Sequence, residues 1–227
     1  MKILVVAAHP DDEVLGCGGT ITRLSREGNE VAIAILGEGV TSRYDDREKA
    51  DPALIKALHG KAGEVAKLLG AKQLSLHSLP DNRFDTVPLL EVVKIVESLV
   101  AGFKPEVIYT HHGGDLNMDH VITHRAVLTA TRPMKGHPVR EVYTFEIASS
   151  TEWAFQNFAP AFRANVFVDI SAGGIEVKQR AMALYESEAR AFPHPRSPEA
   201  LAAIARRWGS VAGCDAAEAF ELVRSVR

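Results

Sequence analysis

The stretch Ile3-Leu4-Val5-Val6-Ala7-Ala8-His9-Pro10-Asp11-Asp12-Glu13 joins an apolar run to a dense group of polar side chains. The apolar run is rich in β-branched residues and is closed by Pro10, which favours a short buried strand. One imidazole and three carboxylates therefore stand together at the carboxyl end of that strand. Carboxylates crowded beside a histidine repel one another unless a proton or a cation holds them, and a metal ion is the simplest explanation.

The composition is that of a globular protein with a sizeable core. The chain has 227 residues, of which 46% are hydrophobic, so residues 1–227 are expected to form a single catalytic domain. The net charge is −3 and no basic run is present, so nucleic acid is not an expected partner. The first apolar run is too short for a signal peptide or a membrane span. Cys17 and Cys214 form no metal or disulfide pattern, which favours a cytoplasmic location.

Strand and helix patterns alternate along the chain. Strands are predicted at Ile3–Ala8, Val31–Leu36, Gln73–Leu76, Val107–Thr110, Val142–Phe145 and Val166–Ile170. Helices are predicted at Leu54–Leu69, from about Pro88 to Phe103 with Asp85 or Thr86 as N-cap, and as a last pair at Glu199–Arg207 and Ala216–Val226. This alternation predicts an α/β fold: a Rossmann-like, doubly wound, mostly parallel sheet with helices on both faces, in a single domain.

A second polar cluster, Thr110 to His120, follows the strand predicted at Val107–Thr110. If the strand order is 3-2-1-4-5, this strand is the neighbour of the strand at Ile3–Ala8. Ligands of such folds bind where the strand order reverses, outside the carboxyl ends of the strands. The two polar clusters of the sequence are therefore expected to meet in one crevice.

Zinc in a catalytic site takes three protein ligands of nitrogen or oxygen type and keeps one position for water. His9, Asp12 and one histidine of the second cluster would supply such a set. The pKa of the bound water would fall to about 7. A neighbouring carboxylate without a metal contact, Asp11 or Glu13, could then act as general base.

Simpler explanations exist for each residue. The three acids could cap and begin the next helix, where carboxylates are favourable without a metal. The pair His111 and His112 could belong to a polar loop, and His120 and His124 could share one helix face at i and i+4. Capping does not explain a histidine at the end of the first strand, nor the second cluster at the matching strand.

Three other functions remain open at this point. Two histidines and a carboxylate also form the facial triad of non-haem iron(II) enzymes, so Fe²⁺ is an alternative to Zn²⁺. The segment Gly16-Cys17-Gly18-Gly19 could belong to a Rossmann-type nucleotide-binding protein, although it lacks the G-x-G-x-x-G pattern. The third alternative function is that of a binding protein in which the metal has a purely structural role.

The first motif, together with Asp119-His120 about a hundred residues later, resembles the PIG-L / LmbE-like superfamily of metal-dependent de-N-acetylases. The resemblance covers nearly the whole chain and is strongest for a bacterial branch associated with amino-sugar and surface-glycan synthesis. The segments that carry it further are Pro80–Asp85, Thr110–His120, Thr131–Pro133, Ser149–Trp153, Phe192–Ser197 and Ala217–Phe220.

The resemblance implies a role for several residues. It implies that the metal, usually Zn²⁺, is bound by His9, Asp12 and His120, and that Asp11 is the general base. It also implies that Asp81 contacts sugar hydroxyls and that Arg43 belongs to the substrate-binding arginines. The implied substrate is an N-acetylated amino sugar or sugar conjugate, and the implied assembly is a homo-oligomer, a trimer or a hexamer.

The sequence departs from the family pattern at Asn117, where many members have a histidine that helps to stabilise the oxyanion. Asparagine can donate a hydrogen bond but cannot carry a proton to the leaving amine. His112 or His124 could supply that proton, and the sequence does not choose between them. A second departure is Ala216, where the branch has tyrosine.

Overall fold

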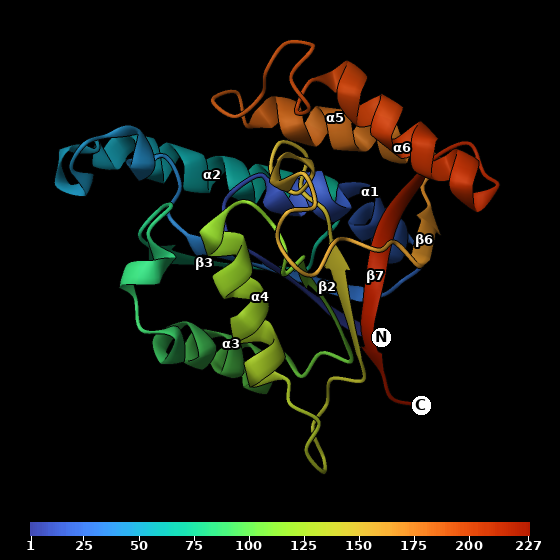
Figure 1. Cartoon of the computed structure of the whole chain (residues 1–227), viewed down its shortest axis with the longest axis horizontal. Helices are drawn as coiled ribbons and strands as arrows, with labels where there is room; N and C mark the ends of the chain where they lie inside the picture. The colour runs from blue at the N-terminus through green and yellow to red at the C-terminus, as the bar shows by residue number, and fades with distance from the viewer.

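A mixed β-sheet runs through the computed structural model, which describes residues 1–227 (Figure 1). Its strands are β1 Lys2–Ala7, β2 Glu30–Gly37, β3 Gln73–Leu79, β4 Val107–His111, β5 Glu141–Phe145, β6 Val166–Asp169 and β7 Ala217–Ser225. Their order is β3-β2-β1-β4-β5-β7-β6. The first five are parallel, whereas β7 is antiparallel to both β5 and β6. The doubly wound α/β fold predicted from the sequence, with β1 beside β4, is confirmed.

Helices cover both faces of the sheet. They are α1 Asp12–Arg26, α2 Pro52–Leu69, α3 Leu89–Phe103, α4 Met118–Ala130, α5 Gly174–Leu184 and α6 Pro198–Ala212, with 3₁₀ turns at Thr41–Arg43, Arg47–Lys49, Phe84–Thr86 and Glu152–Ala154. Helices α3 and α4 pack on one face, and α1, α2, α5 and α6 lie over the other (Figure 1). None of the helices combines the length and the apolar character that crossing a bilayer requires.

The strand β1 has apolar side chains on both of its faces. Ile3, Val5 and Ala7 point into the core beneath α1 and α2, whereas Leu4 and Val6 point into the core beneath α3 and α4. Each large aliphatic side chain buried in this way contributes about 1.5–3 kcal/mol. A strand covered on both sides needs a continuous apolar run, which is why β1 was recognisable in the sequence.

The helix predicted over Ala216–Val226 is wrong, because this segment forms β7. Helix α6 ends at Ala212 and is capped by Gly213, whose φ of 78° is left-handed. Alanine and glutamate are good helix formers, and they account for the prediction. In the fold, Phe220 pairs with Phe145 of β5 and with Val166 of β6, and this pairing on both sides outweighs the local preference.

The predicted N-cap of α3 is also wrong. Asp85 and Thr86 lie in a 3₁₀ turn, and the helix begins after Pro88. The residue before a proline avoids helical angles, and Val87 is extended accordingly, with φ −100° and ψ 130°. The helix cannot begin upstream of Pro88 for this reason.

The glycines of Gly16-Cys17-Gly18-Gly19 lie inside α1, where two of them allow close packing. A methyl group on Gly16 would come within 2.4 Å of the Phe145 ring, and one on Gly19 within 2.9 Å of Ile170. The segment therefore forms a close contact between α1 and its neighbours, not a phosphate-binding loop. This placement argues against the nucleotide-binding alternative.

We expect Gly16→Ala to destabilise the fold by about 1–3 kcal/mol, because the added methyl overlaps a buried ring. The matched control is Gly63→Ala in α2, where nothing lies within 4 Å of the added methyl. That control should be neutral or stabilise the protein by up to about 1 kcal/mol. Urea unfolding of both variants measures the difference, and equal stability of Gly16→Ala and the wild type would contradict the close contact.

Candidate active site

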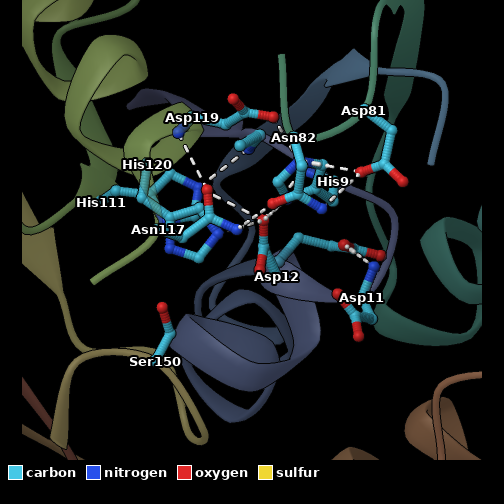
Figure 2. Close-up of polar contacts among 12 residues, drawn as sticks. His9, Asp11, Asp12, Asp81, Asn82, His111, Asn117, Asp119, His120 and Ser150 are labelled. Atoms are coloured by element: carbon cyan, nitrogen blue, oxygen red, sulfur yellow. Dashed lines mark hydrogen bonds and ion pairs between the residues drawn. The ribbon is translucent and has the colours of Figure 1, made fainter. Parts of the chain in front are cut away.

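The two polar clusters of the sequence meet at the carboxyl edge of β1 and β4. His9 follows β1, and Asp12 is the first residue of α1. On the neighbouring strand, His111 ends β4, and His120 lies in the first turn of α4. Figure 2 shows these side chains pointing toward one another. The two clusters therefore meet at the edge of the sheet where the sequence placed them.

Three of these side chains form a set of converging metal-binding atoms. The ligand atoms of His9, Asp12 and His120 all lie within 4.8 Å of one another. Asp12 Oδ2 is 3.4 Å from His9 Nδ1 and 3.3 Å from His120 Nε2. The exposed fractions of Asp12 and His120 are 1% and 2%. Two imidazoles and a carboxylate buried in this way fit a divalent cation of the zinc or iron type.

Two further carboxylates orient the histidines. Asp119 Oδ2 is 2.9 Å from His9 Nε2, and Asp115 Oδ1 is 3.1 Å from His120 Nδ1. A proton on His9 Nε2, shared with Asp119, leaves Nδ1 as a lone pair that faces Asp12. Asp115 attracts a proton to His120 Nδ1 by its charge, and a proton there would leave Nε2 facing Asp12. Such carboxylate–histidine pairs commonly fix the tautomer of metal-binding histidines.

Asp115 is itself held firmly. The hydroxyl of Thr151 donates to its Oδ2 at 2.6 Å, and the hydroxyl of Ser150 donates to its Oδ1. Burial raises the pKa of Asp115, but its hydrogen bonds and its attraction to His120 outweigh burial and lower the pKa to about 2. Asp115 is therefore ionised at neutral pH and suited to hold a proton on His120.

A second group, His9 with Asp81 and Asp119, is also close enough to hold a cation. It would use His9 Nε2, which lies 3.3 Å from Asp81 Oδ1. Its carboxylates already have partners: Asp119 Oδ1 accepts the Phe84 N–H, and Asp81 Oδ2 accepts the N–H and the hydroxyl of Ser42. Asp12 Oδ2 has a partner as well, the backbone N–H of His9. The set with Asp12 and His120 is the better candidate because it offers two imidazoles and one carboxylate, a known ligand combination of catalytic zinc.

Asp11 stands beside that set in an unusual backbone conformation. Its φ of 113° is left-handed, and its N–H donates to Glu13 Oε2 at 3.0 Å. Glu13 also accepts the Tyr185 hydroxyl at 2.7 Å, and burial raises its pKa to about 7 despite that bond. Of the two candidate bases, Glu13 therefore supports the backbone of Asp11.

The carboxylate of Asp11 is paired with Arg196, whose Nη1 donates to Asp11 Oδ2 at 2.7 Å. The same guanidinium donates through Nε to Ser149 at 2.8 Å. Burial raises the pKa of Asp11 and the charge of Arg196 opposes that rise. The sequence did not predict this contact of Arg196. It only placed Arg196 in Phe192–Ser197, one of the segments that carry the family resemblance.

The two histidines considered as proton donors lie outside the set of three. His112 Nε2 is 2.8 Å from the Pro160 carbonyl, and His124 Nδ1 is 2.9 Å from the His111 carbonyl. The polar loop considered for His111 and His112 is wrong, because both side chains are buried. His111 accepts the Ala8 N–H at 2.8 Å and stacks on the ring of His120.

Asn117 is the N-cap of α4. Its Oδ1 accepts the Asp119 N–H at 2.8 Å, and its Nδ2 donates to Asn82 Oδ1 at 2.9 Å. A carboxamide has two N–H donors, so one remains for another partner. The contacts of Asn117 thus give it a structural role that the sequence did not indicate.

The two residues predicted to bind substrate, Asp81 and Arg43, lie in different environments. Asp81 is buried beside His9, as described above. Arg43 is exposed, and its Nη2 is 2.5 Å from Glu188 Oε1. Glu188 also lies 3.7 Å from Arg196, so these charges link the loop after β2 to the loop after α5.

Comparison with known proteins gives consistent matches. The sequence is 25% identical to YaiS of Escherichia coli, which is named an uncharacterized deacetylase. The match covers 82% of this chain and 90% of YaiS. The sequence is also 24% identical to the diacetylchitobiose deacetylase of Thermococcus kodakarensis over 99% of this chain and 84% of that protein. The crystal structure of the conserved protein TT1542 from Thermus thermophilus superposes with a TM-score of 0.75 at 26% identity, covering 99% and 96% of the two chains.

The sequence profile of one family, described as PIG-L: GlcNAc-PI de-N-acetylase, matches residues 4–131. This range is more than half of the chain and contains both polar clusters, from His9 to His120. The resemblance noted from the motifs is therefore confirmed, and the chain belongs to the PIG-L family of GlcNAc-PI de-N-acetylases.

Proposed function

We propose that this protein is a zinc-dependent hydrolase that removes an N-acetyl group from an amino sugar or a sugar conjugate. The observation that carries the proposal is the convergence of His9, Asp12 and His120 beside the buried carboxylate of Asp11, in a chain of a de-N-acetylase family. The name of the Thermococcus relative, diacetylchitobiose deacetylase, supports an N-acetylated sugar as the substrate class.

A bound zinc ion would lower the pKa of a water molecule and polarise the amide carbonyl. In the proposal, His9 Nδ1, Asp12 and His120 Nε2 hold the metal, and Asp119 and Asp115 keep the two imidazoles in the required tautomers. Asp11 accepts the proton of the attacking water as general base. Arg196 fixes one oxygen of Asp11, which leaves the other oxygen for that proton.

The leaving amine needs a proton when the carbon–nitrogen bond breaks. His112 and His124 are bonded to carbonyl groups outside the set of three. Asp11 is therefore the better donor in this proposal, since it holds the proton taken from the water. Asn117 would direct its remaining amide N–H at the oxyanion.

The alternatives are less well supported. An iron(II) enzyme would use the same three side chains, but membership of a de-N-acetylase family favours hydrolysis. A purely structural metal would not require the buried carboxylate of Asp11 beside it. The homo-oligomer and the contact of Arg43 with substrate stay predictions.

The metal set is tested by substitution and metal analysis. We expect about one zinc per chain in the wild type, and at least roughly tenfold weaker zinc binding in Asp12→Asn, because a charged ligand is lost. Asp81→Asn is the matched control, since Asp81 belongs only to the second group, and it should keep the metal. Zinc loss in Asp81→Asn together with retention in Asp12→Asn would show that the second group is the site.

The role of Asp11 is tested by Asp11→Asn, which keeps the shape and removes the base. We expect near-normal zinc content and a turnover lower by roughly 10²–10⁴, the usual contribution of general acid–base catalysis. The assay is acetate release from N-acetylglucosamine, diacetylchitobiose and nucleotide-linked N-acetyl sugars. No acetate from any of them with the zinc-loaded wild type would argue against the proposed function.

Asn117 has two possible roles that different substitutions separate. Asn117→Ser keeps an N-cap but removes the amide donor, so stability should hold while turnover falls by roughly 10²–10³. Asn117→Ala should lose the same activity and also about 0.5–2 kcal/mol of stability. Full turnover in Asn117→Ser would mean that Asn117 only shapes the start of α4.

A further inference from the structure

A cavity of about 580 Å³ lies apart from the candidate active site, on the α1 side of the sheet. It is lined by residues of α1, α5, α6, the start of β7 and the loops after β4 and β5. Helices α5 and α6 and the strand β7 lie together in Figure 1. None of His9, Asp12 and His120 lines it. Its volume is in the range of cavities that hold small molecules in proteins.

A buried ion pair forms part of the cavity wall. Lys178 and Glu218 line the cavity with exposed fractions of 7% and 4%. The ammonium of Lys178 donates to Glu218 Oε1 at 2.7 Å and to the Leu15 carbonyl at 2.8 Å. An ammonium has three donors, so the third hydrogen of this buried group has no protein acceptor.

Glu218 also binds backbone N–H groups of α1, in addition to its bond with Lys178. Helix α1 is interrupted at Cys17, where φ is −151° and ψ is 24°. The carboxylate of Glu218 accepts the N–H groups of Gly19 and Thr20 beyond this break, at 3.1 and 2.7 Å. These bonds explain why a carboxylate is buried here, but they leave the third hydrogen of Lys178 unused.

The remaining wall is mainly apolar. Leu201, Ile204, Phe162 and Trp208 contribute apolar surface. Burial raises the pKa of Glu146, which accepts the Trp208 indole N–H at 2.5 Å. The other charged groups of the wall are two cations, Lys178 and Arg207, and two carboxylates, Glu218 and Glu152. The carboxylates offset both cations, which disfavours an anionic ligand, and the unused N–H of Lys178 disfavours a cationic one.

We propose that this cavity binds an uncharged, mainly apolar small molecule whose carbonyl or hydroxyl oxygen accepts the third hydrogen of the Lys178 ammonium. The cavity does not include the proposed metal ligands, but it shares one residue with the hydrogen bonds that hold them in place. Thr151 lines the cavity and also donates to Asp115, the partner of His120. The ligand would therefore contact a residue that holds the active-site framework in place.

The probe for the test is 2-octanone, which combines an apolar chain with one carbonyl acceptor. Titration into the full chain should give saturable shifts of the Leu201 and Ile204 methyl signals in NMR spectra. Ala161→Trp, which fills the cavity from the loop after β5, should weaken binding by at least about tenfold. Val211→Trp places the same ring on an exposed position of α6 outside the cavity and should change nothing.

The role of Lys178 has its own readouts. The carbonyl carbon of labelled 2-octanone, when bound, should resonate near its position in water and not near its position in hexane, because the oxygen accepts a hydrogen bond. The double variant Lys178→Met with Glu218→Gln removes both charges and should bind the ketone about tenfold more weakly, the loss of one bond to a charged donor.

Three outcomes would overturn the proposal. The first is a wild type with no saturable shift at Leu201 and Ile204, and the second is equal affinity in Ala161→Trp and Val211→Trp. The third is a bound carbonyl carbon that resonates at its hexane position, which excludes the Lys178 hydrogen bond even if the double variant does not fold.

Discussion

The buried carboxylate of Asp12 is the interaction on which the active-site framework depends. An isolated ionised carboxylate is too costly to bury, so it must have cationic or hydrogen-bonding partners. Asp12 Oδ2 accepts the His9 N–H at 2.8 Å and lies 3.3 Å from His120 Nε2. Burial raises the pKa of Asp12, but a proton on His120 and the hydrogen bonds from His120 and His9 outweigh burial and hold the pKa well below its usual value.

The fold supplies these partners because β1 and β4 are parallel neighbours. Their carboxyl ends lie at the same edge, where α1 and α4 begin. Asp115 and Asp119 then fix the two imidazoles from outside, and each is held in turn by hydroxyl or backbone donors. A metal-binding set of this kind needs its outer partners as much as its ligands, since they determine which ring nitrogen faces inward.

The sequence was sufficient for the central strands because strands buried on both faces need continuous apolar runs. It was also sufficient to place His9, Asp12 and His120 at one edge, since parallel order brings strand ends together. It failed for β7, where helix-forming alanine and glutamate residues are overruled by pairing with β5 and β6.

The outer part of the site could not be read from the sequence because it depends on loop conformation. Arg196 contacts Asp11 across 185 residues of chain, and no local pattern signals such a contact. Asn117 looked like a replacement for a catalytic histidine, yet its carboxamide also caps α4 and binds Asn82. The burial of His112 likewise involves the loop after β5, where its ring contacts the Pro160 carbonyl and the ring of Phe162.

The central claim is the position of the metal, and anomalous diffraction from a crystal soaked with zinc tests it most directly. The proposal predicts one peak bonded to His9 Nδ1, Asp12 and His120 Nε2, at about 2.0–2.2 Å from each ligand atom. A peak bonded to His9 Nε2, Asp81 and Asp119 would contradict it, and so would a zinc ion bound directly to Asp11.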